Sequence, residues 1–388
     1  MKTVSSNNKF IYAVLRIGAI AFIGIWAHLV WTPMQNLDNR VLDWNMRSYA
    51  GKTSPDPDVV ILNIDEHSLE AMTPEYGRYP WSRAAFASII ESIEKQKPAA
   101  IVFDILFIDP HREHQQDDLY FINTIINTNN TYFPMVLLET DAPGGEGYPL
   151  NQLTAAIRTN QANDNAKTAL LLPMTGIHNT GRLGTINIDE DPDGVIRRTS
   201  MYTEIEGWRI PSLPRTVAVG LGYSVPDVDS LPLVWLQGEK GRQHYSFFDV
   251  YRDLGLRQPK EYGNIFTNKI VVVGSTATAL GDLKTTPLGT DFPGVEVLAT
   301  AIDNIKNQRR LLSLPGATSP LLIIIILIVL AWSFHRGLPP LAAGVGLLLT
   351  SICLLLFSRL LLSQWLIILY PATIILTAWI FYVVELSL

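Results

Sequence analysis

The apolar residues of this 388-residue chain gather at its two ends. One apolar stretch covers residues 10–30 and others follow Leu314, whereas the segment between them is charged. All 36 acidic residues except Glu385 lie between Asp38 and Asp303. A helix needs about 20 mostly apolar residues to cross a bilayer core, where no water can bind a free backbone amide. The pattern predicts a membrane protein with one large water-exposed domain.

Four transmembrane helices are expected, one before the polar domain and three after it. We expect a cytoplasmic N-terminus and first helix at residues 1–31, an outer domain at 32–315, and further helices at 316–334, 341–358 and 364–385. A cleaved signal peptide is the alternative for the first stretch. However, no small-residue cleavage pattern follows it, and its apolar part is longer than a usual signal core.

Basic residues beside the apolar stretches predict the orientation. Lys2, Lys9 and Arg16 flank the first stretch, and Arg336 lies in the turn between the second and third. Because cytoplasmic loops are rich in Lys and Arg, both places should be cytoplasmic, although Arg359 in the opposite turn departs from strict asymmetry. In a bacterium, this describes a multi-pass protein of the inner (plasma) membrane with its large domain in the periplasm or extracellular space.

Charge and cysteine content restrict the outer domain. Between Asp38 and Arg310 the chain holds 25 basic and 35 acidic residues, a formal charge of −10. Nucleic acid is therefore not an expected partner, since binding to phosphates requires basic residues. The single cysteine, Cys353, lies in the third apolar stretch, so a packed core and not disulfides must hold the outer domain together.

Strand and helix patterns alternate in the outer domain. Continuous apolar runs at residues 59–64, 99–103 and 270–273 are typical of strands buried on both faces of a parallel sheet. Ser82 could cap a helix that ends near Pro98, which would make the first two strands a β-α-β unit. This alternation of strands and helices predicts an α/β core.

The middle and the end of the domain add other elements. Residues 184–188, a turn at 193–194 and the polar–apolar alternation at 195–210 predict antiparallel strands. Helices are expected near residues 213–221 and 295–307, and the second of these should lead directly into the next membrane helix. The expected fold is an α/β domain with a mixed, partly parallel sheet, plus four transmembrane α-helices.

Several sequence blocks resemble one known family. These blocks are VVILNIDEHSLEAM, RYPWSRAAFASII, AAIVFDILFIDP, INIDEDPDGVIRRT, HYSFFDV and KIVVVGSTATALGDLKTTPLGTDFPGVEVLATAIDNI. Over residues 38–315 they are similar, in the same order, to the second class of CHASE domain (cyclases/histidine kinases associated sensory extracellular). The resemblance implies a bacterial homodimeric receptor that signals to a cytoplasmic histidine kinase, nucleotide cyclase or protein kinase, carried by a longer protein or by a separate partner.

Acidic residues that follow the predicted strands are candidate ligand-binding residues. Asp65 and Asp104 each come directly after a buried strand, and Asp109 lies further along the second loop. Ligands of α/β sheets tend to bind beyond the carboxyl ends of parallel strands, so on neighbouring strands the two carboxylates could hold a cation or a positively charged ligand. The alternative is that they cap the following helices and tie loops together.

Trp81 and Arg83 are candidates of a different kind. A guanidinium can bind a carboxylate at two points, and an indole offers an aromatic surface. The structural alternative pairs Arg83 with Asp65 or Asp104 and uses Trp81 to fill space.

Ser275, Asp282 and Thr286 complete the candidate ligand site. Ser275 belongs to a Gly-Ser-Thr sequence whose backbone N–H groups could hold an anion at a helix start, and the other two lie in the loop beyond it. Residues 189–194 resemble part of a calcium loop, but Ser200 stands where the bidentate glutamate should be, so a hairpin turn is the simpler interpretation. We expect no metal and no cofactor.

The leading hypothesis is a sensory receptor whose outer domain detects a small ligand or a periplasmic protein. The outer domain lacks a cysteine nucleophile, and the chain contains no GxSxG or HExxH motif, so we expect no enzyme within these residues. Two alternatives remain open at this point. One is a membrane-anchored scaffold that docks a periplasmic protein, and the other is an outer hydrolase that uses Asp65 and Asp104 with a metal.

Overall fold

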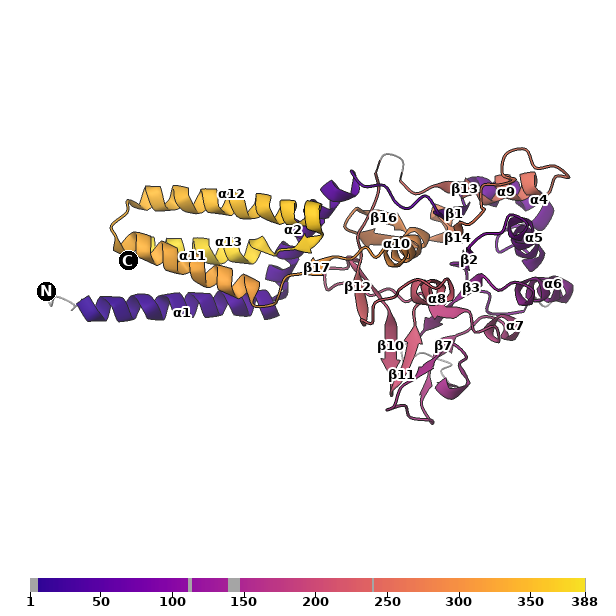
Figure 1. Ribbon diagram of the computed structural model, residues 1–388, viewed down its shortest axis with the longest axis horizontal. Coiled ribbons are helices and arrows are strands. Elements are labelled where there is room, and N and C mark those ends of the chain that lie inside the picture. Colours follow the sequence, from indigo (N-terminus) through magenta and orange to yellow (C-terminus); the bar gives the residue numbers. More distant parts are fainter. Residues whose placement is uncertain (1–5, 111–113, 139–146, 239–240, 388) are drawn as a thin grey trace. The chain divides into compact units, whose positions relative to one another are not determined.

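The chain divides into two compact units. The computed structural model describes residues 6–110, 114–138, 147–238 and 241–387. One unit combines Met1–Tyr49 with Leu311–Leu388, and the other comprises Ala50–Arg310. Figure 1 traces the elements of both units along the chain. Residues 1–5 of the predicted cytoplasmic segment lie outside the described part.

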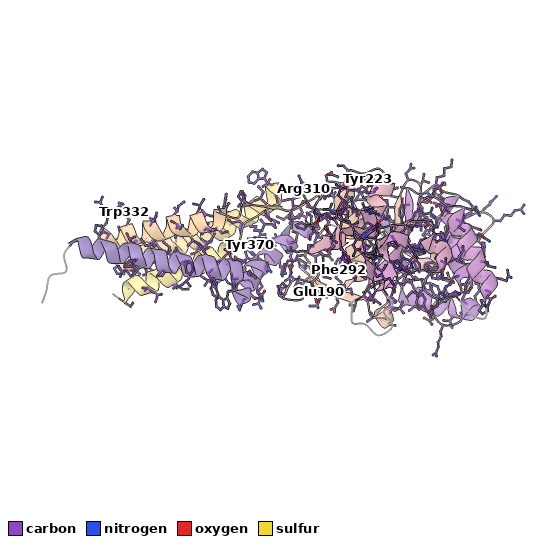
Figure 2. The ribbon with its side chains drawn as sticks, turned by 90° about the horizontal axis from the view of Figure 1, so that it is seen from below. Glu190, Tyr223, Phe292, Arg310, Trp332 and Tyr370 are labelled. Carbon is purple, nitrogen blue, oxygen red and sulfur yellow. The ribbon has the colours of Figure 1, made fainter. Side chains whose placement is uncertain are left out.

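The first unit is a bundle of apolar helices. Its elements are α1 (Ser6–Val30), α2 (Thr32–Ala50, which reaches one residue into the second unit), α11 (Thr318–His335), α12 (Pro340–Trp365) and α13 (Pro371–Leu386), with the short parallel pair β17 (Leu312–Ser313) and β18 (Ile367–Ile368). Helix α1 packs against α11 and α13, and α12 packs against α13 (Figure 1). Leu327, Ile374 and Phe381 are buried in the bundle core. Outward-facing side chains are apolar too, as for Trp332 of α11, which is 56% exposed (Figure 2).

Not all of these helices are long enough to cross a membrane alone. Within the described residues, α11 and α12 meet the length and composition expected of a span, and α1 with α2 does so as a pair bent by 73°. Helix α13 is apolar but has 16 residues, which gives about 24 Å against the ~30 Å of a bilayer core. The structure thus supports two or three spans by length and composition, where the sequence predicted four.

The second unit is built on a seven-stranded, mainly parallel sheet. The strand order is β13–β1–β14–β2–β3–β7, with β8 also paired to β3. All pairs are parallel except β3 with β7, so the prediction of a mixed, partly parallel sheet is confirmed. The strands are β1 (Val59–Ile64), β2 (Ala100–Phe103), β3 (Thr131–Leu137), β7 (Leu170–Leu171), β8 (Leu183–Thr185), β13 (His244–Ser246) and β14 (Ile270–Ser275).

Helices cover both faces of this sheet. Val60 and Leu62 of β1 face one core, to which α5, α6 and α9 contribute, whereas Val59 and Ile61 face a second core with α8 and α10. Alternate residues of one strand are thus buried on opposite faces, which explains the continuous apolar runs in the sequence. The helices are α3 (Glu66–Ala71), α4 (Thr73–Tyr76), α5 (Arg83–Glu94), α6 (Gln115–Ile126), α7 (Thr175–His178), α8 (Leu213–Gly220), α9 (Phe247–Leu254) and α10 (Gly294–Lys306).

Short strands and turns surround the main sheet. The predicted antiparallel strands of the middle section are present in part, because β10 and β11 form an antiparallel hairpin whereas β8 joins the main sheet in parallel. The remaining elements are β4 (Tyr148–Pro149), β5 (Ile157–Arg158), β6 (Lys167–Thr168), β9 (Arg198–Ser200), β10 (Tyr202–Ile205), β11 (Trp208–Pro211), β12 (Ser230–Pro232), β15 (Leu283–Thr286), β16 (Gly289–Pro293) and the 3₁₀ turns η1 (Leu150–Gln152) and η2 (Thr278–Leu280).

Two details of connectivity differ from the sequence-based expectation. Strand β14 lies between β1 and β2, so the first two predicted strands are parallel but are not neighbours. Helix α10 does not lead directly into α11, because residues 307–317 separate them and include the left-handed Gln308 (φ 54°) and strand β17. The prediction of a direct helical connection was therefore wrong.

Candidate functional site

Asp65 and Asp104 do not meet. Each follows its strand as predicted, but β14 separates β1 from β2, which places the two strands about 10 Å apart. Asp65 instead caps α3, where its carboxylate accepts hydrogen bonds from the Ser68 backbone N–H (2.8 Å), the Ser68 hydroxyl (2.6 Å) and the Ser246 hydroxyl (3.1 Å). The structural interpretation fits Asp65, and the metal-binding pair required by the hydrolase alternative does not form.

Asp104 stands where two cavities adjoin. One cavity of about 420 Å³ is lined by Asp104, Asp282, Ser275 and the aromatic residues near α5. The other, of about 120 Å³, is lined by Asp104 and Asp282 together with residues of β8, β15 and α10. Both carboxylates border both cavities, so the later loop at Asp282 supplies the partner that the sequence analysis had assigned to Asp65.

Close backbone contacts hold Asp282 in place. The Gly294 N–H donates to the Asp282 carbonyl (2.9 Å), and a Cβ atom at Gly294 would lie 1.9 Å from Asp282 Oδ2. Lys284 Nζ lies 3.0 Å from Asp282 Oδ1. Because Gly294 is the first residue of α10, the Asp282 carboxylate touches the start of that helix. A larger residue at position 294 would displace it.

The environment of Asp104 opposes its ionisation. Burial, together with the negative charge of Asp282, raises the pKa of Asp104 to about 7, although the Lys284 ammonium acts in the opposite direction. Among the described residues, the Asp104 carboxyl group has no hydrogen bond or ion pair, and its backbone N–H donates to the Val273 carbonyl (2.8 Å). A carboxyl group without a partner, with a pKa near neutrality and beside a cavity, is typical of a functional site and not of a structural one.

Aromatic side chains form one wall of the larger cavity. Trp81 is fully buried, contacts Tyr79 edge to face (ring centroids 5.3 Å apart), and packs against Phe86. Its Nε1–H has no hydrogen-bond partner among the described residues. Phe107 also lines this cavity. Trp81 therefore fills space, as the structural alternative held, and also borders the cavity.

Arg83 binds neither of the carboxylates suggested from the sequence. Its guanidinium lies over the Phe107 ring (5.7 Å to the centroid), donates from Nη2 to the Asp109 carbonyl (3.1 Å), and has its Nε 3.8 Å from Asp118. The proposed pairing with Asp65 or Asp104 was wrong, because α6 carries Asp118 closer to the start of α5 than either strand end. Asp109 itself is exposed, and its contact with Arg83 comes from its backbone.

Ser275 and Thr286 are occupied by contacts within the fold. Ser275 lines the larger cavity, but its hydroxyl donates to the Ile64 carbonyl (2.8 Å) and accepts from the Ala277 N–H (3.0 Å). A 3₁₀ turn and not an α-helix follows β14, so the predicted anion site at a helix start is not formed. Thr286 is buried at the end of β15, where its hydroxyl accepts from the Leu288 N–H.

The acidic segment at residues 189–194 is a turn tied down by arginine. Arg197, which is largely buried, donates to Asp191 (2.9 Å) and to Asp193 (2.8 Å). The Gly194 N–H closes the turn on the Asp191 carbonyl, and Gly194 has a φ of 74° that favours glycine. Two of the three carboxylates that a calcium ion would require are thus bound to a guanidinium, and the third, Asp189, accepts a hydrogen bond from the Ser200 hydroxyl. Across the described ranges, no group of three His, Cys, Asp or Glu side chains is arranged to hold a metal.

A buried ionic cluster at the end of α10 was not predicted from the sequence; we call it the α10 clasp (Asp56, Arg242, Asp303, Lys306 and Arg309). Asp303 is fully buried, and Oδ2 accepts from the Asp56 backbone N–H (2.9 Å) and from Arg242 (3.3 Å), while Oδ1 pairs with Arg309. Lys306 Nζ lies 2.7 Å from Asp56 Oδ2. Burial raises the pKa of Asp56, but hydrogen bonds from Lys306 and the neighbouring Asn307 outweigh this and lower it to about 2. The sequence held one indication of this cluster, which is the opposite charge of the acidic residues 56 and 58 and the basic residues 306, 309 and 310.

Comparison with known proteins identifies the family. A family model described as the CHASE2 domain matches residues 19–333, which include the whole second unit, its two adjoining cavities and the α10 clasp. Searches of curated proteins and of solved structures found no match. The match covers well over half of the chain, and CHASE2 domains are extracellular sensory domains of membrane proteins. The chain therefore belongs to the CHASE2 domain family.

Proposed function

We propose that this chain is the sensory module of a multi-pass receptor of a bacterial inner membrane, with the unit Ala50–Arg310 outside the cell or in the periplasm. A small ligand binds where Asp104 and Asp282 adjoin, and the signal passes through the membrane helices to a cytoplasmic kinase or cyclase. Membership in a family of extracellular sensory domains supports this role, as do the apolar helices of the first unit. Four crossings and a homodimeric receptor are parts of the same proposal.

The observation that carries the proposal is the position of α10. Its first residue, Gly294, touches the Asp282 carboxylate, and its last turn belongs to the α10 clasp. The clasp joins residue 56, which follows the entry of the chain into the second unit, to residues 303–309, which precede its exit. A ligand that moves Asp282 therefore acts on a helix whose other end holds both connections to the membrane unit. Such a ligand can shift the receptor only if it binds one arrangement more tightly than the other.

A reporter fusion tests the sensory role. A kinase or cyclase reporter is fused after Leu388, and its output is compared in the wild type, Asp104→Asn, Asp282→Asn and the control Glu190→Gln. Glu190 is an exposed residue of another loop (Figure 2). We expect both site variants to change the output in at least one growth medium, while the control matches the wild type. Outputs identical to the wild type in every medium for both site variants would contradict the proposal.

A further inference from the structure

Helix α2 has one face held by the helix bundle and one face exposed. On the buried face, Asp38 accepts a hydrogen bond from the Ala372 N–H (2.8 Å) at the start of α13. One turn and a half further on, the buried Asn45 donates to the Ser358 hydroxyl (3.2 Å) of α12. Because contacts to two helices fix the rotation of α2 about its axis, its outward face is a defined surface of the first unit (Figure 1).

The outward face of α2 combines arginine with large apolar side chains. Leu37, Arg40, Trp44 and Arg47 are all exposed and recur at helical spacing, so they form one stripe along the helix. Trp44 is 51% exposed. Such a stripe is typical of a helix in a membrane interface, where apolar groups reach the acyl boundary and arginines stay at the headgroups.

Arg359 of α12 adds a second helix to this stripe. It is the basic residue that departs from the positive-inside pattern of the sequence. Its guanidinium lies over the Trp44 ring (5.0 Å to the centroid), and its Nη2 donates to the Ser48 hydroxyl. Within the described part of the chain, neither Arg359 nor the exposed Arg40 has an ion pair with a carboxylate. The surface around Trp44 therefore offers two guanidinium groups to an external anion.

The course of the chain places this surface beside a headgroup layer. In the proposed topology α1 crosses the membrane, and α2 turns from it by 73°, so that α2 runs closer to the membrane plane than to the membrane normal. The chain leaves α1 at Trp31 and leaves α12 at Trp365, and both indoles are exposed. Exposed tryptophans at helix ends are typical of the membrane–water interface.

From these observations, we propose that Arg40, Trp44 and Arg359 bind the headgroup of an anionic phospholipid of the outward-facing leaflet. The two guanidinium groups donate to the phosphate oxygens, for which their planar geometry is suited, and Leu37 lies toward the acyl chains. This inference goes beyond the sensory function and rests on the proposed topology only for the crossing of the membrane by α1.

Quenching of Trp44 by brominated lipids tests this site in the full chain, reconstituted in phosphatidylcholine bilayers. The quencher is phosphatidylglycerol or phosphatidylcholine brominated at the same acyl positions, and subtraction of the Trp44→Phe signal isolates the fluorescence of Trp44. Each arginine near an anionic headgroup contributes about fivefold in affinity. We therefore expect brominated phosphatidylglycerol to reach half-maximal quenching at a mole fraction about 25-fold below that of brominated phosphatidylcholine.

Four variants assign the contacts. Arg40→Gln and Arg359→Gln should each reduce the preference for phosphatidylglycerol about fivefold, whereas Arg359→Lys, which keeps the charge, should retain more of it than Arg359→Gln. The matched control is Arg252→Gln, which removes an exposed arginine that lies over the Phe248 ring (5.2 Å) in the second unit. Its quenching should equal that of the wild type.

Three results would overturn the lipid site. These are equal quenching by the two lipids in the wild type, an unchanged preference in the double variant of Arg40→Gln and Arg359→Gln, and relief of quenching by inorganic phosphate, which would assign the site to a free anion. Absence of quenching by either lipid would also remove α2 from the membrane interface. The reporter effects of Asp104→Asn and Asp282→Asn would stand in each case, so failure of the lipid site is distinguishable from failure of the sensory role.

Discussion

Replacement of Asp104 by asparagine should stabilise the outer unit strongly at alkaline pH and much less at acidic pH. The pKa of Asp104 rises from an ordinary value of 3.8 to about 7 because of burial and the charge of Asp282. Between these two values the folded state binds a proton that the unfolded state has released, so the free energy of unfolding decreases as the pH rises. Above pH 7 the full decrease in the free energy of unfolding is present, and below about pH 4 it is absent.

The size of this effect follows from the shift. A difference of about three pKa units at roughly 1.4 kcal/mol each gives about 4 kcal/mol at pH 8.5. Asparagine keeps the shape of the side chain, removes the charge, and breaks no hydrogen bond that Asp104 makes in the described structure. For a unit of this size, 1 kcal/mol changes the melting temperature by about 2–4 °C. The variant should therefore melt about 8–16 °C above the wild type at pH 8.5.

Thermal unfolding followed by tryptophan fluorescence measures the difference between variant and wild type at pH 5 and at pH 8.5. Using this difference cancels the titration of groups that do not interact with Asp104, and Glu190→Gln controls for the loss of one carboxylate at an exposed position. The difference should grow with pH and reach half its final size below pH 7. A difference that is equal at both pH values, or a wild type that is more stable at pH 8.5, would refute the reasoning.

Three further substitutions probe neighbouring contacts. Gly294→Ala should change reporter output with little loss of stability, because its Cβ would displace the half-exposed Asp282 carboxylate; an unchanged output would contradict the close contact. Asp303→Asn removes the buried carboxylate that Arg242 and Arg309 share and should cost about 3–5 kcal/mol in urea unfolding, and a loss below 1 kcal/mol would count against the clasp. Asp65→Ala should cost about 1 kcal/mol through the lost helix cap while reporter output stays at the wild-type level, so a changed output would return Asp65 to the ligand site.

The strands of the core were predictable because burial on both faces leaves a continuous apolar run in the sequence. The order in which the strands pair was not predictable, since nothing local in residues 270–275 indicates that this late strand lies between β1 and β2. That one insertion explains why the predicted meeting of Asp65 and Asp104 failed. It also brings the loop that carries Asp282 to the end of β2.

Two residues with the same local signal have different roles. Asp65 and Asp104 each follow a buried strand, but Asp65 is followed by a helix with Ser68 at its third position, where a cap can form. Asp104 is followed by the apolar segment ILF, which begins no helix and offers its carboxylate no backbone N–H groups to accept from. The sequence therefore contained the distinction between a capping and a free carboxylate, whereas the partner of the free one depended on long-range pairing.

The contacts of α10 argue that the outer unit changes state in one step and not gradually. A single buried guanidinium, that of Arg242, lies 3.3 Å from Glu296 in the first turn of α10 and 3.3 Å from Asp303 in its last turns. A helix that slides or rotates relative to Arg242 must therefore break both contacts together, which leaves the buried Arg242 guanidinium without a charge partner. Intermediate positions are disfavoured, because packed elements with such paired contacts have few alternative arrangements. A ligand at Asp282 that favours a second position of Gly294 would then alter the clasp as a whole, and the two chain segments that lead to the membrane helices would respond together.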